Sequence, residues 1–172
     1  MAPRKPSQAE QRRADLKDEF WPGERAWQSF REKGYFSAPR TLPLVMVAID
    51  LKNLSGNKRP SKVYVELLSN HIGQGIVELV PVEDHAFAAG YTGSRAVRTW
   101  SERMKLLETL GFIKTKEKGN RRFGYVLLRH PTIVMSELHD DGKIPDSLWN
   151  ALKAKQIDAR ELTLVQIREG EG

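Results

Sequence analysis

The chain has 172 residues, of which 40% are hydrophobic and 29% are charged, and it contains no cysteine. This composition predicts one globular domain with flanking arms, and the absence of thiols excludes disulfides and thiolate-bound zinc or iron–sulfur sites. No apolar run approaches the roughly 18 residues of a membrane span, and charged residues follow Met1 where a signal peptide would be apolar. We therefore expect a soluble cytoplasmic protein with no membrane partner.

Positive charge is concentrated between residues 91 and 130. The whole chain has 28 lysines and arginines against 22 aspartates and glutamates, a net charge of +6. Residues 91–130 alone hold ten basic and three acidic residues, whereas residues 132–172 hold five basic and eight acidic residues. A basic segment is typical of a polyanionic partner, although it also suits a solvated surface. The acidic tail is expected to dock on the core, on a second chain or on another protein.

Residues 1–59 are predicted to form a helical arm that packs on the core. Ser7 precedes a helix-forming run, Pro22 interrupts it, and a second helix is expected to end before Gly34. The apolar LVMVAIDLKNL then predicts a buried helix, with Pro43 in its first turn and Thr41 as its cap. The arm's aromatic residues would cover either the chain's own core or a second subunit; they are Phe20, Trp21, Trp27, Phe30, Tyr35 and Phe36.

The middle of the chain alternates between helical and strand-like segments. In order, the predicted elements are a helix from Ser61 to near Gly73, a strand at 76–80, helices at 82–89 and 94–110, and strands at 112–116 and 123–128. The polar segment between the last two strands predicts a hairpin turn. Pro145 is predicted to begin a further helix in the tail.

This order of elements, together with the phrase LLETLGFIKTKEKGNRRFGYVLL (106–128), resembles the winged helix-turn-helix superfamily. The resemblance implies an α+β, mainly helical fold. Residues 60–131 would form the winged helix-turn-helix core, with extra N-terminal helices before it and a C-terminal helical tail at 132–172. It also implies that the third helix of the core reads DNA and that the hairpin is a wing.

The stretch GYTGSRAVRTW (90–100) predicts a tight corner followed by a basic helix. Gly90 and Gly93 allow backbone angles that side chains disfavour, as a helix-turn-helix corner requires. On a helical wheel, Trp100, Met104 and Leu107 share one face, so Trp100 is expected to be core rather than a platform for a ligand.

The opposite face of this helix and the hairpin carry the predicted DNA-binding residues. Arginine pairs bidentately with guanine, and glutamate accepts from cytosine or orients a neighbouring arginine. Hydroxyl residues at a helix start suit a phosphate, and a basic hairpin suits the backbone or the minor groove. For the helix arginines, a merely solvated surface is the alternative. The set is Thr92, Ser94, Arg95, Arg98, Thr99, Glu102, Lys105, Lys116, Lys118, Arg121 and Arg122.

The sequence contains no phosphate-binding glycine loop, nucleophile motif or metal-ligand spacing. We therefore expect no enzyme activity, no metal and no cofactor. The expected function is sequence-specific binding of double-stranded DNA by a homodimer, as a transcriptional regulator or as a replication or partition factor of a mobile element. Such a protein would be nucleoid-associated in a bacterium. The alternative is a winged-helix protein-interaction module within a larger assembly, whose basic residues face an acidic partner.

Overall fold

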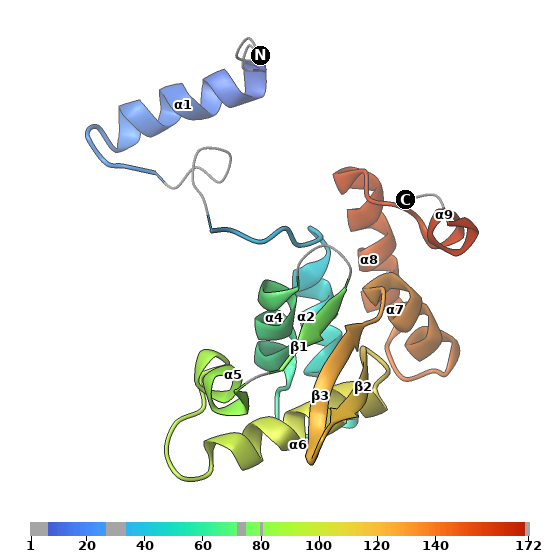
Figure 1. Ribbon diagram of the computed structural model, residues 1–172. Coiled ribbons are helices and arrows are strands. Elements are labelled where there is room, and N and C mark those ends of the chain that lie inside the picture. The colour runs from blue at the N-terminus through green and yellow to red at the C-terminus, as the bar shows by residue number, and fades with distance from the viewer. Residues whose placement is uncertain (1–6, 27–33, 72–74, 80, 171–172) are drawn as a thin grey trace. The chain divides into compact units, whose positions relative to one another are not determined.

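The computed structural model describes residues 7–26, 34–71, 75–79 and 81–170, and the chain divides into two compact units, Met1–Tyr35 and Phe36–Gly172 (Figure 1). The first unit contains α1 (Gln8–Phe20), which begins with a capping box between Ser7 and Glu10. No residue of α1 is buried, and Phe20 is 58% exposed. The second helix predicted in this arm falls mainly on residues 27–33, which lie outside the described residues.

The second unit is a mixed α+β fold in which helices predominate, as the sequence predicts (Figure 1). Its elements are α2 (Leu42–Ile49), α3 (Lys52–Ser55), α4 (Ser61–Asn70), β1 (Ile76–Glu78), α5 (Val82–Ala88), α6 (Ala96–Thr109), β2 (Ile113–Lys118), β3 (Arg121–Leu128), α7 (Pro131–Asp140), α8 (Asp146–Ala159) and α9 (Leu164–Glu169). Among the described residues, none of the helices is both long enough and apolar enough to cross a bilayer.

The strands form one antiparallel sheet in the order β1-β3-β2. Val77 of β1 lies opposite Val126 of the central strand, and both side chains are buried. The pairing of β2 with β3 is irregular between Lys116 and Lys118. A Cβ at Gly124 would collide with the backbone of Lys118, so the close approach of the two strands at this irregularity requires glycine.

One hydrophobic core joins the helices to the inner face of the sheet. Aromatic side chains meet in it edge to face: the Tyr64 and Phe112 ring centroids are 5.4 Å apart, and those of Trp100 and Phe123 are 5.8 Å apart. Its largest fully buried members include Ile49, Leu67, Leu79, Met104, Leu107, Ile113, Met135 and Leu152. Because α2, α7 and α8 supply several of these, the core extends beyond residues 60–131.

The division into units differs from the predicted boundary between residues 59 and 60. The apolar side of α2, including Val45 and Ile49, is fully buried, so this helix belongs to the second unit and not to an arm. A hydrogen bond also joins the two ends of this unit, because the Thr41 hydroxyl donates to the Glu161 carboxylate (2.8 Å). Thr41 therefore does not cap α2 with its side chain, although the sequence predicts that it does.

Asp50 explains why the run LVMVAIDLKNL is not one helix. It follows α2, and its carboxylate accepts hydrogen bonds from the backbone N–H and the hydroxyl of Ser61, at 3.0 and 2.6 Å. The predicted single helix is therefore split into α2 and the short α3. Ser61, which the sequence predicts as a cap, is instead the first residue of α4.

Candidate nucleic-acid interface

The corner between α5 and α6 has the geometry that the glycines predict. Gly90 has φ +87° and Gly93 has φ +79°, both in the left-handed region that favours glycine. The N–H of Tyr91 closes the end of α5 by donating to the carbonyl of Ala86 (2.9 Å). The chain thus turns between two helices within a short loop, and the loop leads directly into α6.

The inner face of α6 fixes how the helix is rotated. Trp100, Met104 and Leu107 are fully buried, which confirms that Trp100 is a core residue. The Trp100 indole packs edge-on against Phe123 of β3. Rotation of α6 would expose these side chains, so the core determines which residues of α6 face solvent.

The outer face of α6 presents several of the predicted residues to solvent. Arg95 is the N-cap residue of α6, and it is exposed; within the described part of the chain it makes no ion pair. The Arg98 side chain is 81% exposed, and Lys105 is also exposed. The helix starts at Ala96, later than the predicted Ser94, because the chain is still turning at residues 93–95. Ser94 and Thr92 consequently lie exposed in the loop before the helix.

Glu102 is half-buried and lies between two arginines of α6. Its carboxylate is 3.6 Å from Nε of Arg98 and 3.3 Å from Nη1 of Arg103. Thr99 is also half-buried, and its carbonyl accepts a hydrogen bond from Arg103 (3.3 Å). Of the two roles that the sequence left open for Glu102, the geometry fits orientation of Arg98.

Arg103 helps to position α6, a role that the sequence does not indicate beyond counting it among the basic residues. Its side chain is 16% exposed, and its Nε donates to the carbonyl of Lys58 (3.2 Å). Its guanidinium lies 5.6 Å from the ring centroid of Tyr91 in the corner. Arg103 therefore connects α6 to the corner and to the loop before α4.

The β2–β3 hairpin carries the remaining predicted residues, and its turn lies on the same lower side of the second unit as the corner in Figure 1. Lys116, Arg121 and Arg122 are exposed, and the Arg122 guanidinium lies 5.4 Å from the ring centroid of Phe123. Among the described residues, Lys116 and Arg121 form no ion pair with a carboxylate. Three cationic groups of the hairpin are thus available to an anion.

Lys118 differs from its neighbours because its ammonium pairs with the carboxylate of Glu78 on β1. The same group lies 5.4 Å from the ring centroid of Tyr125, which is opposite Glu78 on the neighbouring strand. The hydrogen bond to Glu78 is the main cause that raises the pKa of Lys118. This lysine therefore joins the outer strands of the sheet, and it is less available to a phosphate than the sequence suggests.

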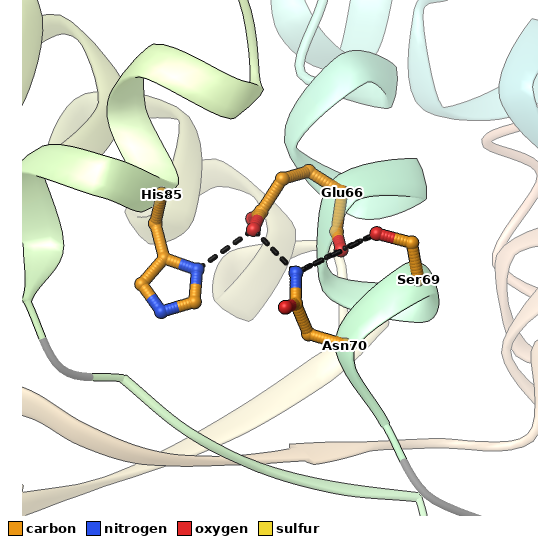
Figure 2. Close-up of polar contacts among 4 residues, drawn as sticks. All are labelled: Glu66, Ser69, Asn70 and His85. Carbon is orange, nitrogen blue, oxygen red and sulfur yellow. Dashed lines mark hydrogen bonds and ion pairs between the residues drawn. The ribbon is translucent and has the colours of Figure 1, made fainter. Parts of the chain in front are cut away.

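A polar cluster beneath the corner links α4 to α5 (Figure 2). His85 Nδ1 lies 2.7 Å from Glu66 Oε1, and the Asn70 amide donates to the same oxygen (2.7 Å). The His85 ring stacks 6.3 Å from Trp100 of α6. Both His85 and Glu66 are buried, so this cluster positions α5 against α4 and α6. One signal in the sequence indicates this cluster: Glu66 stands on the apolar face of its helix, between Val63 and Leu67.

Arg129 is another basic residue of the 91–130 segment that faces its own protein. Its guanidinium makes a two-pronged ion pair with Glu137 of α7, at 2.7 and 2.9 Å, and donates to the carbonyl of Gly111 (2.9 Å). The hydrogen bond from Arg129 lowers the pKa of Glu137. Arg129 therefore links the second half of α7 to Gly111, just after the end of α6.

The described residues contain no group of three or more histidine, aspartate or glutamate side chains that could hold a metal ion.

The candidate interface consists of the corner, the outer face of α6 and the exposed part of the hairpin. Comparison with known proteins found no match, whether among family models, curated proteins or solved structures.

Proposed function

We propose that the second unit is a winged helix-turn-helix that binds double-stranded DNA sequence-specifically. The order α4–β1–α5–α6–β2–β3 and the sheet order β1-β3-β2 support this assignment. In this proposal α5 and α6 are the helix-turn-helix pair, and the β2–β3 hairpin is the wing. The protein acts as a transcriptional regulator or as a replication or partition factor of a mobile element, and not as an enzyme.

The observation that carries the proposal is that α6 has one buried face and one exposed face. The buried Trp100 lies on the inner face, while Arg95 and Arg98 are exposed at the first turn of the helix. Residues at the N-terminus of such a helix are the ones that reach base edges in the major groove. In this proposal Arg98, whose Nε lies 3.6 Å from the Glu102 carboxylate, pairs with guanine, and Arg95 is assigned to a neighbouring base.

The hairpin supplies the contacts that do not depend on sequence. Lys116, Arg121 and Arg122 are assigned to phosphates or to the minor groove, and Thr92 and Ser94 in the corner to a phosphate. We expect Lys118 to contribute less to phosphate binding than the other hairpin residues, because its ammonium is already paired with the Glu78 carboxylate.

We further propose a homodimer, because one such domain reads only a short half-site and a two-fold pair reads two half-sites.

The C-terminal helices offer a separate surface for a protein partner. Ile157 on α8 is 72% exposed and Val165 on α9 is 62% exposed. Trp149, in contrast, is engaged within its own chain, where it stacks on His139 at 5.4 Å. Trp27 and Phe30, which the sequence offers as dimer contacts, lie outside the described residues.

Selection of bound fragments from a random duplex library, followed by measurements on single variants, tests the DNA-binding proposal. Arg95→Ala and Arg98→Ala should each weaken binding to the selected site by about 1–3 kcal/mol and relax its specificity at one position. Random duplexes should be affected much less. Lys155→Ala, which removes the same charge from the exposed surface of α8, is the matched control and should change neither affinity.

Two outcomes would contradict the proposal in different ways. Equal losses on selected and random duplexes would remove Arg95 and Arg98 from base recognition while leaving DNA binding intact. No enrichment of any duplex, even at low salt, would leave the alternative function, a protein-interaction module whose basic surface faces an acidic partner.

A further inference from the structure

A cavity of about 370 Å³ opens on the second unit, among α4, the end of β3, the start of α7 and the segment before α9. This volume lies within the range of about 300–1,000 Å³ that is usual for small-molecule sites. None of the predicted DNA-binding residues belongs to its described wall. The apolar part of the wall consists of Pro39, Leu68, Leu128, Pro131 and Leu162.

Two residues of the wall carry buried polar atoms that have no hydrogen-bond partner among the residues that the structure describes. They are the hydroxyl of Tyr64 and Nδ1 of His71. Unpartnered buried groups are uncommon in proteins, because each loses its hydration without compensation. Burial raises the pKa of Tyr64, so its hydroxyl keeps its proton and can donate it to an acceptor.

Several other polar groups along the wall are already engaged. The Thr132 hydroxyl accepts a hydrogen bond from Gln156 (2.9 Å). The Glu161 carboxylate accepts from both the backbone N–H and the hydroxyl of Thr41, at 3.1 and 2.8 Å. Since Arg129 is paired with Glu137, the described wall offers no unpaired cation to balance an anionic ligand.

His130 completes the wall as a neutral donor. Its Nδ1 accepts a hydrogen bond from the N–H of Thr132 (3.3 Å), which places the proton of the neutral ring on Nε2. Burial lowers the pKa of His130, so the ring is uncharged near pH 7. The cavity is therefore mainly apolar and supplied with hydrogen-bond donors, and the carboxylate in its described wall, that of Glu161, already accepts hydrogen bonds from Thr41.

We propose that this cavity binds a small uncharged molecule with a ring-sized apolar body and one hydroxyl or carbonyl oxygen, which accepts a hydrogen bond from Tyr64. An anionic group is disfavoured, because burying a charge without a partner is costly. The Tyr64 hydroxyl is covered in the structure, so binding requires a side-chain shift at the wall, as is common in complexes. The proposal does not depend on DNA binding.

Phenol and toluene are matched probes for this proposal, because they share the ring and differ in the hydroxyl. Titration of the full chain with each probe, followed by the NMR shifts of wall residues such as Leu128 and His130, gives the two dissociation constants. We expect phenol to bind about two- to tenfold more tightly than toluene, the range that one net hydrogen bond provides.

Tyr64→Phe removes only the unpartnered hydroxyl, so the variant should fold, and its preference for phenol over toluene should disappear. Leu162→Trp provides an independent check, because Leu162 is 39% exposed at the wall and a larger side chain there should block both probes without disturbing the core. Equal affinities of the wild type for the two probes would overturn the proposal. So would the absence of saturable binding, a phenol preference that survives in Tyr64→Phe, or unchanged binding in Leu162→Trp.

Discussion

Replacing Arg121 and Arg122 together by alanine should weaken binding to every duplex and flatten the dependence of affinity on salt. Both side chains are exposed at the start of β3, and no carboxylate of the described chain pairs with either. Each phosphate contact contributes about 0.9 to the slope of log K against log salt. Loss of two contacts should therefore reduce the slope by about 1.8. Between about 50 and 200 mM salt, the wild-type protein should then lose about twelvefold more affinity than the double variant.

Lys118→Ala provides an internal contrast on the same hairpin. Because Glu78 engages the Lys118 ammonium, this variant should flatten the slope less than Arg121→Ala does. Lys155→Ala removes a charge of the same sign from α8 and should leave the slope unchanged. Fluorescence anisotropy of one labelled duplex over a series of salt concentrations measures all of these slopes.

The same titrations can refute the assignment of the hairpin. A slope in the Arg121/Arg122 double variant equal to that of the wild type would remove the hairpin from the interface. Equal flattening by Lys155→Ala would show that the assay responds to net charge and not to a local contact.

Two further predictions concern the corner and the assembly. Gly93→Ala should lower the free energy of unfolding by about 1 kcal/mol, because Gly93 has φ +79° and no neighbour lies within 4 Å of an added Cβ. Urea denaturation measures this loss. The exposed Ser94→Ala is the control, and its free energy of unfolding should stay within about 0.5 kcal/mol of the wild type. A free energy of unfolding unchanged in Gly93→Ala would mean that the corner does not need a left-handed residue. Light scattering at micromolar concentration, with and without residues 1–38, should show a dimer formed through the N-terminal arm, the tail or both. A full-length monomer with and without DNA would rule the dimer out.

The sequence predicts the corner and α6 well because both depend on local chemistry. A 3.6-residue period places Trp100, Met104 and Leu107 on one side, and these are the residues that the core buries. The glycines mark the turn because only a residue without a Cβ adopts positive φ at little cost. Such signals require no knowledge of distant segments.

The remaining features depend on tertiary contacts that join distant parts of the chain. Thr41 and Glu161 are 120 residues apart in the sequence, and their hydrogen bond joins the segment predicted as an arm to the segment predicted as a tail. The pair between Glu78 and Lys118 forms only because β1 and β2 flank the same central strand. The helix α7 lies within the helical tail predicted at 132–172, but the sequence analysis does not single it out, although Pro131 at its first turn is a local signal for its start.

The charge count of the basic segment overstates the charge that it offers to a polyanion. Of its ten basic residues, Arg103, Lys118 and Arg129 are bound to groups of their own chain, and the exposed Arg98 pairs with Glu102. One carboxylate, that of Glu102, pairs both with the mostly buried Arg103 and with the exposed Arg98. An arginine restrained before contact loses less side-chain freedom on binding than a free one. Under the proposed function, Glu102 and Arg103 favour recognition by a fixed surface over recognition by a diffuse positive field, because they restrain α6 and Arg98.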